Sequence, residues 1–327
     1  MGERRRLINL AYRLLGSLAD AEDVVQETYA RWYAMPRRER EAIGSPGGWL
    51  TTVASRICLN VLGSARVRRE RYVGEWLPEP LPLWREWAGA GSAAAADPAD
   101  LITLDESVGM AFLVVLESMT PAERVAFVLH DVFQYPFAEV AAVVGRSSAA
   151  CRQLASSARR RLRAAQEPAA PTGARAGVVR EFKRAWEARD LRSLVGVLDP
   201  DATVVADGGG LVGALLRPLS GSERIARAYL EFARIAPVTT LLERTVNGRP
   251  GLVAQQDGVT VTVIAFRIVE ARITHIWAVR NPEKLRPWTD PRPSAGAVAG
   301  GSPSAGSPPA GSAPTGPAPA GFLPVRG

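Results

Sequence analysis

Apolar side chains recur at helical spacing through the first seventy residues of the chain. The stretch DAEDVVQETYARWYA, residues 20–34, repeats with a period of about 3.6 residues, so its apolar side chains share one helix face. Asp20 is expected to cap the start of this helix. The apolar face holds Val24, Val25, Tyr29 and Trp32, and the opposite face holds Glu22, Asp23, Gln26 and Glu27.

A long helix is predicted after the loop SPGG at residues 45–48. It runs through WLTTVASRICLNVLGSARVRRERY, residues 49–72, and no strand-like alternation interrupts it. Its C-terminal end is cationic, with arginines at positions 66, 68, 69 and 71 against one acid, Glu70. The pattern predicts one helical unit for this part of the chain.

A linker and a second helical unit follow. Four prolines lie between positions 78 and 98, and each removes a backbone donor, so residues 75–98 cannot form one regular element. We expect this linker to be flexible. In the second unit, TPAERVAFVLHDVF predicts a capped helix, with Thr120 as N-cap, Pro121 at the first helical position and Glu123 completing a capping box.

The stretch FAEVAAVVGRSSAACRQLASSARRRL, residues 137–162, has the spacing of a helix-turn-helix, with its turn at residues 145–147. Between Arg146 and Gln166 there are six arginines and no acid. Ala138, Val140, Ala141, Val144, Ala149, Ala150 and Leu154 are expected to pack the two helices together. Ser148, Arg152, Gln153, Ser156, Arg159 and Arg160 are left to face outward. Such a helix enters the DNA major groove, where Arg and Gln contact bases. The alternative is a solvated basic helix that stabilises its own C-terminus.

The pattern changes after residue 176. A helix is expected over residues 178–198, a short strand and glycine turn in DATVVADGGG, and a further capped helix in SGSERIARAYLEFARIA. Residues 239–279 alternate like strands, with tight turns at DG and EA, which predicts an antiparallel sheet in an α+β domain. Residues 287–327 are Pro, Gly, Ala and Ser with almost no charge, so we expect disorder there.

Composition narrows the function classes. The 327 residues carry a net charge of +7, which fits nucleic-acid binding without requiring it. Two cysteines, Cys58 and Cys151, fall in helical patterns and can form neither a disulfide framework nor a zinc site. The N-terminus lacks the pattern of a signal peptide, and no apolar run is long enough to span a membrane. We therefore expect a cytoplasmic protein that binds no membrane and needs no metal or cofactor.

The stretches LAYRLLGSLADAEDVVQETYARWYA and GGWLTTVASRICLNVLGSARVRRERYVGEWLPEP, with the helix-turn-helix after them, resemble bacterial RNA polymerase sigma factors of the extracytoplasmic-function (ECF) type. The third unit, with DGGG and NPEKL, resembles the SnoaL-like (polyketide-cyclase-like) domain that one subgroup carries. The resemblance implies two all-α sigma domains, the second with a helix-turn-helix, then an α+β SnoaL-like cone and a disordered tail. The expected segments are 1–75 (region-two-like), 76–100 (linker), 101–166 (region-four-like), 167–176 (linker), 177–286 (SnoaL-like) and 287–327 (tail).

The resemblance also implies roles for particular residues and partners. Core RNA polymerase is expected to bind Asp23, Gln26 and Glu27. The melting region of promoter DNA is expected to contact Trp49, Arg56, Asn60, Arg66, Arg68 and Arg69. The upstream promoter element is expected to contact Arg146, Ser147, Ser148, Arg152, Gln153, Ser156, Arg159 and Arg160. The third domain is expected to act as a built-in regulator in place of a separate anti-sigma factor, through Asp207, Gly208, Gly209, Gly210, Asn281, Pro282, Lys284 and Leu285. Leu211 stands where lysine is usual after DGGG, which puts the charged contact of that turn in question.

Two other functions compete with promoter recognition by a sigma factor. One is a helix-turn-helix repressor or activator with a ligand-sensing domain, and an unknown small ligand is in any case possible in a SnoaL-like pocket. The other is a cyclase or isomerase, for which Asp207 and His275 are the titratable candidates. An Asx turn explains Asp207 as well as chemistry does, and a lone strand histidine is more often structural. No nucleophile or paired-carboxylate constellation is apparent, so no enzyme is expected.

Overall fold

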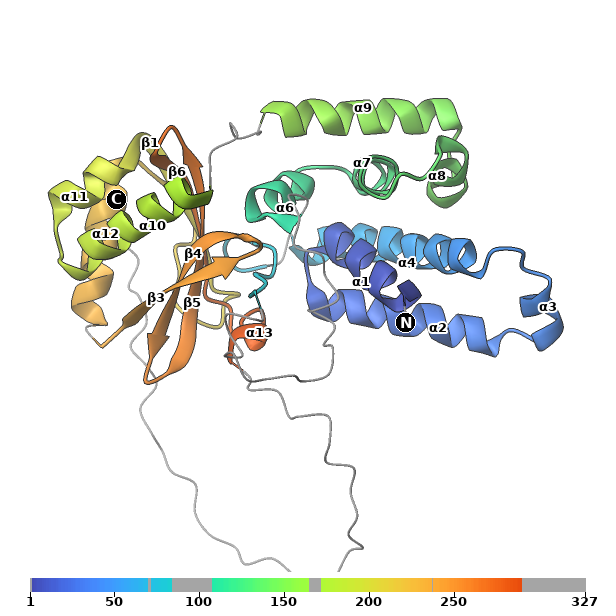
Figure 1. Cartoon of the computed structure of the whole chain (residues 1–327), viewed down its shortest axis with the longest axis horizontal. Coiled ribbons are helices and arrows are strands. Elements are labelled where there is room, and N and C mark those ends of the chain that lie inside the picture. Colours follow the sequence, from blue (N-terminus) through green and yellow to red (C-terminus); the bar gives the residue numbers. More distant parts are fainter. Residues whose placement is uncertain (1, 70–71, 84–107, 165–171, 237, 290–327) are drawn as a thin grey trace, which may run out of the picture.

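The computed structural model describes residues 2–69, 72–83, 108–164, 172–236 and 238–289 of the chain (Figure 1). Side chains of residues 65–69 lie outside the described part. Two layers of helices occupy one side of the molecule and an α+β domain the other. The predicted fold class is confirmed.

The first helical unit consists of four helices, α1 (Gly2–Leu15), α2 (Leu18–Ala34), α3 (Arg37–Glu41) and α4 (Pro46–Arg69). The predicted N-cap of α2 is wrong. Ser17 has the extended backbone of a cap, and its hydroxyl accepts a hydrogen bond from Asp20 N–H at 3.2 Å. Asp20 instead lies in the first turn, where its charge favours the helix dipole.

The second helical unit is described from Val108 onward; its first α-helix there is α6 (Met110–Glu117), and it ends with the helix-turn-helix. Thr120 and Glu123 form the predicted capping box at the start of α7. Gly145 ends α8 in the left-handed conformation, with φ 70°, and α9 starts at Ser148, as the sequence predicts. A π-helical turn after α7 was not predicted. These elements are α7 (Pro121–Phe127), η2 (Val128–Val132), α8 (Phe137–Val144) and α9 (Ser148–Ala164).

The two helical units share one hydrophobic core. Leu10 and Leu14 of α1, Ala54 of α4, and Val125 and Leu129 of the second unit are all at most 1% exposed within it. In this conformation the two units are therefore packed against each other, unlike two units that move independently on a flexible linker. Residues 84–107 of the predicted linker lie outside the described residues.

The third domain begins with α10 (Thr172–Glu187) and α11 (Leu191–Val197). The single helix expected over 178–198 is wrong, because Arg189 takes a left-handed backbone, φ 55°, and Asp190 caps a new helix. The first residues of α10 also occupy the end of the linker expected at 167–176. The sheet and its remaining helices comprise β1 (Leu198–Asp207), β2 (Leu219–Ser220), α12 (Ser222–Ile235), β3 (Thr240–Val246), β4 (Arg249–Gln256), β5 (Val259–Val269), β6 (Arg272–Val279) and α13 (Arg286–Thr289).

The six strands are ordered β2-β1-β6-β5-β4-β3. The predicted turns at Asp257–Gly258 and Glu270–Ala271 are confirmed, and a further hairpin turn at Asn247–Gly248, which was not predicted, joins β3 to β4. The expectation of a purely antiparallel sheet is wrong, since β1 pairs with β6 in parallel. Disorder from residue 287 is wrong for its first residues, because α13 buries Trp288 to 1% exposure. Residues 290–327 of the expected tail lie outside the described residues.

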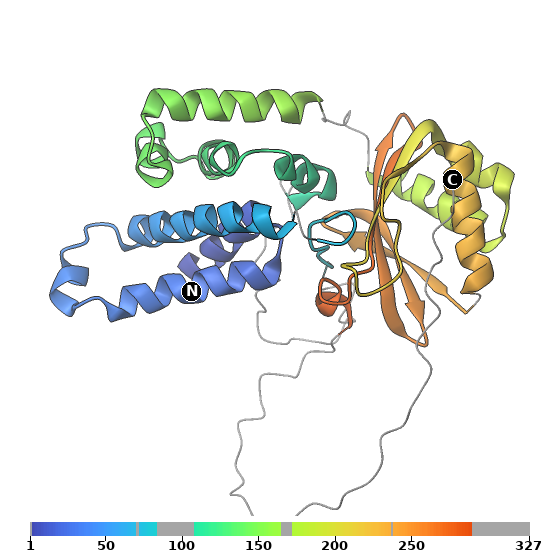
Figure 2. The same ribbon diagram turned by 180° about the vertical axis from the view of Figure 1, so that it is seen from behind.

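The two faces of the sheet have different partners (Figure 1). Helices α10, α11 and α12 cover one face. The other face is turned toward the helical units and packs against the segment 72–83, α6 and α13, as the reverse view makes clear (Figure 2). Leu77, Met110 and Trp288 form a small core there with strand residues such as Val263 and Trp277. The third domain is therefore joined to the rest of the chain through a buried apolar surface.

Candidate functional site

The predicted polymerase-binding residues lie on an open face of α2. Asp23, Gln26 and Glu27 are exposed, while Val24 and Val25 are buried on the opposite face. Glu27 pairs with Arg31 one turn further along. An exposed i,i+4 pair contributes a few tenths of a kcal/mol, so another partner can displace it at little cost.

The predicted melting-region residues lie on or beside α4. Trp49 is half-buried and packs against Trp32 in a tilted arrangement, with ring centroids 5.2 Å apart. Asn60 is exposed, and Arg56 donates a hydrogen bond to the Ala142 carbonyl of α8 at 2.8 Å. Arg56 of the first helical unit thus contacts the second helical unit. The side chains of Arg66, Arg68 and Arg69, near the end of α4, lie outside the described part.

The helix-turn-helix exposes most of its predicted contact residues. Arg146, Arg152, Gln153, Ser156 and Arg160 are exposed along one side of the turn and α9. The prediction of the buried face was partly wrong. Its buried members in α9 are Cys151, Ala155 and Ala158, while Ala149 is exposed, as is Ala138 on α8.

Three predicted contact residues of the motif form hydrogen bonds within the protein, and a fourth, Arg152, lies over the Phe137 ring at 5.6 Å. Arg159 forms two hydrogen bonds with the Asp131 carboxylate, at 2.6 and 3.2 Å. The Ser147 hydroxyl accepts from Ala150 N–H at 3.2 Å and so caps α9, and Ser148 donates weakly to the Phe137 carbonyl at 3.4 Å. Arg159 therefore holds α9 against η2 within the protein itself.

The two helical units are held together by buried polar contacts as well as by their core. Arg124 of α7 is 2% exposed and donates to the Leu14 carbonyl of α1 at 2.9 Å and to Glu117 at 2.7 Å. Burial lowers the pKa of Arg124 to about 9. Tyr135 donates to the Thr51 hydroxyl of α4 at 2.9 Å. Charge-assisted and buried hydrogen bonds of this kind are worth more than surface pairs.

The Asp207 carboxylate lies at the centre of the contact between the third domain and the segment 72–83. Oδ1 accepts from Tyr72 Oη at 2.6 Å, and also from Gly209 N–H at 3.0 Å, which is the Asx turn anticipated from the sequence. Oδ2 accepts from Leu77 N–H at 2.9 Å and from Lys284 Nζ at 2.6 Å. Asp207 is fully buried, and its four hydrogen bonds offset the cost of burying its charge.

Other residues of DGGG and NPEKL complete this interdomain network. Lys284 Nζ also donates to the Leu77 carbonyl at 2.5 Å and lies 4.0 Å from the centre of a Trp76 ring, a cation–π contact. Asn281 donates to Tyr72 Oη at 2.9 Å. Burial and the adjacent Asp207 carboxylate raise the pKa of Tyr72 well above its ordinary value. Leu285 is buried in the sheet-side core, whereas Pro282 is exposed.

The glycines of DGGG are needed because the turn lies close to Asn281 of its own domain and to Val73 of the segment 72–83. A Cβ on Gly209, which has φ 65°, would lie 2.4 Å from Asn281 Nδ2, and one on Gly210 would lie 2.9 Å from Val73 Cβ. Leu211 is 61% exposed at the edge of this turn. The cation paired with Asp207 is thus supplied by Lys284 of NPEKL, and the replacement of the usual lysine by Leu211 does not remove the charged contact.

A second contact, not predicted from the sequence, centres on Asn247 in the β3–β4 turn. Its side-chain carbonyl accepts from Leu81 N–H at 3.0 Å, and its amide donates to Tyr12 Oη and to the Val108 carbonyl, each at 2.9 Å. Asn247 is 1% exposed. One side chain of the third domain therefore contacts α1, the segment 72–83 and the second helical unit at once.

Glu79 is another functional candidate that the sequence analysis missed. Its carboxylate accepts from Leu18 N–H at 2.7 Å, at the start of α2, and the side chain is 5% exposed. Burial raises the pKa of Glu79 to about 7, although the hydrogen bond from Leu18 opposes the rise. Glu79 lies in the WLPEP stretch, which contributes to the family resemblance, but the pattern of that stretch does not predict that the glutamate is buried.

Comparisons with known proteins agree with this arrangement. Residues 2–70 match the family model for sigma-70 region 2, and residues 109–162 match that for sigma-70 region 4. ECF RNA polymerase sigma factor SigJ of Mycobacterium tuberculosis (strain H37Rv) is 38% identical over 300 residues, which cover 86% of this chain and 90% of SigJ. The chain belongs to the ECF RNA polymerase sigma factors.

Further relatives support the whole-length likeness of this sigma factor. Probable ECF RNA polymerase sigma factor SigI of the same strain is 36% identical over 286 residues, covering 87% of this chain and 92% of SigI. The crystal structure of M. tuberculosis SigJ superposes with a TM-score of 0.68 at 36% identity, covering 86% of this chain and 95% of that one. The likeness therefore extends through the third domain.

As a sigma factor, the chain binds core RNA polymerase and promoter DNA to direct promoter-specific initiation, and it is not an enzyme. The interpretation as an ordinary helix-turn-helix repressor or activator is not favoured. Within the described ranges, no helix is both long and apolar enough to cross a membrane.

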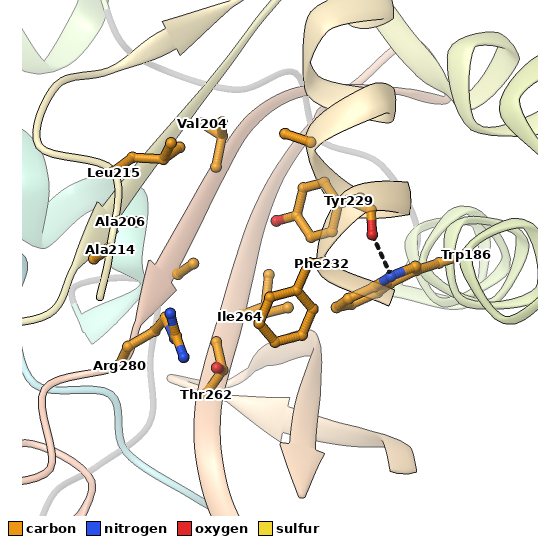
Figure 3. A pocket seen from close by; sticks show the side chains of 12 residues that line it. Trp186, Val204, Ala206, Ala214, Leu215, Tyr229, Phe232, Thr262, Ile264 and Arg280 are labelled. Atoms are coloured by element: carbon orange, nitrogen blue, oxygen red, sulfur yellow. Dashed lines mark hydrogen bonds between the residues drawn. The ribbon is translucent and has the colours of Figure 1, made fainter. Parts of the chain in front are cut away.

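The third domain of the sigma factor contains a cavity between its sheet and α12 (Figure 3). Neither enzyme candidate lines it: Asp207 belongs to the interdomain network, and His275 lies beside Trp277, with ring centroids 5.8 Å apart. Burial lowers the pKa of His275. In the part of the chain that the structure describes, no cluster of His, Cys, Asp or Glu could hold a metal ion.

Proposed function

We propose that the third domain is a built-in regulator that restrains the two promoter-binding units of this sigma factor in a packed conformation. The observation that carries the proposal is the position of Asn247, whose one side chain contacts both helical units and the segment between them. The interdomain network around Asp207 supports it. A domain that binds both units shifts the equilibrium between their packed and separated arrangements toward the packed one.

Within this proposal, α2 binds core RNA polymerase through Asp23, Gln26 and Glu27. α4 contacts the melting region through Trp49, Arg56, Asn60, Arg66, Arg68 and Arg69, and flipped bases there need stacking and cationic groups. α9 and its turn contact the upstream element with the exposed residues described above, while Arg159 acts indirectly by holding α9 on Asp131. Arg56 supports a restrained state, since its guanidinium donates a hydrogen bond to the Ala142 carbonyl of the other helical unit.

The regulator replaces a separate anti-sigma factor in this proposal, because the chain's own domain already binds both units. The sigma factor acts on the RNA polymerase of the cytoplasm. Affinity isolation of the intact protein from its own cells is expected to recover polymerase subunits without a stoichiometric inhibitor.

The test compares two glycine substitutions in otherwise equivalent turns. Asn247 and Asp257 each occupy the first position of a two-residue turn before glycine, and each has φ 49°. Asn247→Gly keeps the turn and removes the interdomain hydrogen bonds, while Asp257→Gly is the matched control. With core polymerase and a promoter from the protein's own upstream region, Asn247→Gly is expected to raise transcription several-fold and Asp257→Gly to leave it unchanged. Equal activity of the two variants would show that the third domain does not restrain the chain.

A further inference from the structure

The cavity of the third domain has one polar end in an otherwise apolar lining. Its volume is about 70 Å³, and its wall includes Trp186, Tyr229 and Phe232. One water needs on the order of 10–15 Å³ on this measure, so the space suits a ligand of roughly five to seven non-hydrogen atoms. Figure 3 shows Arg280 and Thr262 together at one side and Trp186 at the other.

Two buried donors at the polar end have unused capacity. The Thr262 side chain is 5% exposed, and its hydroxyl has no hydrogen-bond partner among the described residues. Arg280 donates to the Gly213 carbonyl and lies 5.4 Å from the centre of the Phe232 ring, but its Nε is likewise unpartnered there. Within the described ranges no carboxylate pairs with this guanidinium, and burial lowers the pKa of Arg280. Arg280 is half-buried, but its Nε is fully removed from solvent, and a cation that is partly desolvated without an anion is costly. A bound anion would offset that cost.

We infer that this cavity is a binding site for a short-chain aliphatic monocarboxylate, whose carboxylate pairs with Arg280 and accepts from Thr262. The hydrocarbon part of the ligand lies against the aromatic wall. A phosphate group is a poor fit, because Arg280 is the one charged side chain among the lining residues and a dianion would leave most of its oxygens without donors. No carboxylate or histidine is among the described residues that line the cavity.

The site is connected to the interdomain network through Arg280. The backbone N–H of Arg280 donates to the Asp207 carbonyl at 2.7 Å, and Asn281 of the network follows directly. Ala214 and Leu215, which line the cavity, belong to the same loop as Gly210, which lies against Val73. A ligand in this cavity can therefore alter how firmly the third domain restrains the promoter-binding units. This regulatory effect rests on the proposed function, whereas the binding of the ligand does not.

The first experiment measures binding by isothermal titration calorimetry with the full chain. Propionate, butyrate and isovalerate are the probes, and the uncharged amide of each is its shape-matched control. At least one acid is expected to bind ten times or more tightly than its amide. Arg280→Met is expected to abolish this preference, while Arg224→Met, an exposed arginine on α12, keeps it.

Thr262→Val changes one hydroxyl for a methyl group and provides a second test if Arg280→Met unfolds the domain. It is expected to weaken binding of the acid several-fold and to leave the amide unaffected. Absence of binding by all three acids, equal binding of acid and amide, or a preference that survives both substitutions would overturn the inference. In the transcription assay, the acid that binds is expected to change the activity of wild type and not of Arg280→Met. Binding without such a change would overturn the connection to the network and leave the site in place.

Discussion

Lys284 Nζ lies 2.6 Å from Asp207 Oδ2, and the Asp207 side chain is completely buried. Both residues belong to the third domain, and Asp207 also accepts from Gly209 of that domain. Tyr72 and Leu77 of the segment 72–83 make three further hydrogen bonds with the pair. The ion pair thus presents an organised polar surface to that segment. The stability of the ion pair therefore depends on the contact with the segment 72–83 as much as on the third domain itself.

Breaking this pair should destabilise the folded chain strongly. Lys284→Met keeps the length of the side chain and leaves the Asp207 carboxylate buried without its cation, so the free energy of unfolding is expected to fall by about 3–5 kcal/mol. Chemical denaturation measures the change. Lys183→Met is the matched control, because the Lys183–Glu187 pair is partly exposed on α10 and is expected to contribute less than about 1 kcal/mol. Equal effects of the two substitutions would contradict the assigned importance of the buried pair.

Glu79 is expected to make stability depend on pH in the direction opposite to that of an ordinary ion-paired acid. Its pKa is raised from 4.5 to about 7 in the folded chain, so the folded state holds the proton more tightly than the unfolded state. The contribution of this group to stability is therefore full below pH 4.5, falls as pH rises to 7, and is constant above. Its size is about 3 kcal/mol at most.

The measurement is the difference in unfolding free energy between wild type and Glu79→Gln across pH 4.5 to 8. Glutamine mimics the protonated acid, so wild type is expected to lose stability relative to the variant as pH rises through this window. Glu39→Gln, an exposed glutamate on α3, supplies the control curve. A wild-type curve that runs parallel to that of Glu79→Gln would mean that Glu79 is already ionised when folded at pH 5.

Local features of the chain were predictable because the residues that cause them are neighbours in sequence. Thr120, Pro121 and Glu123 make a capping box among themselves, and Gly145 can take the left-handed backbone that the turn of the helix-turn-helix requires. The DG turn between β4 and β5 follows from the same kind of local rule. The sigma-like order of these elements could therefore be recognised before the structure was known.

The contacts between units could not be predicted from such patterns. Asn247 looks like an ordinary turn residue in Asn-Gly, and nothing near it in sequence shows that Leu81 and Val108 meet its side chain. The parallel pairing of β1 with β6 likewise joins strands more than sixty residues apart. The packing of α4 against α8 through Arg56 depends on the arrangement of two units that the sequence treats as separate.

Charge reversal on α2 tests the proposed polymerase contact. Asp23→Lys with Glu27→Lys is expected to weaken binding to core RNA polymerase at least tenfold, because the exposed acidic face would then repel a basic partner surface. Fluorescence anisotropy with labelled protein measures the affinity. Glu41→Lys reverses an exposed acid on α3 that also pairs with an arginine, and it is expected to leave the affinity within about twofold. If all these variants bound core enzyme as wild type does, the polymerase would have to contact another face of the chain.

Two exposed residues of α9 should separate base recognition from phosphate contact. Gln153→Ala is expected to cost about 1–3 kcal/mol on the preferred upstream element and to relax base preference at one position. Arg160→Ala is expected to weaken binding about equally on all sequences and to reduce the salt dependence by about one unit. Both are measured with holoenzyme on promoter variants over a range of salt concentrations. Arg159→Ala should behave differently from either, since it breaks the Arg159–Asp131 pair and lowers the stability of the helix-turn-helix itself. If instead Arg160→Ala relaxed base preference and Gln153→Ala weakened binding equally on all sequences, the end of α9, and not its first turns, would lie over the base edges.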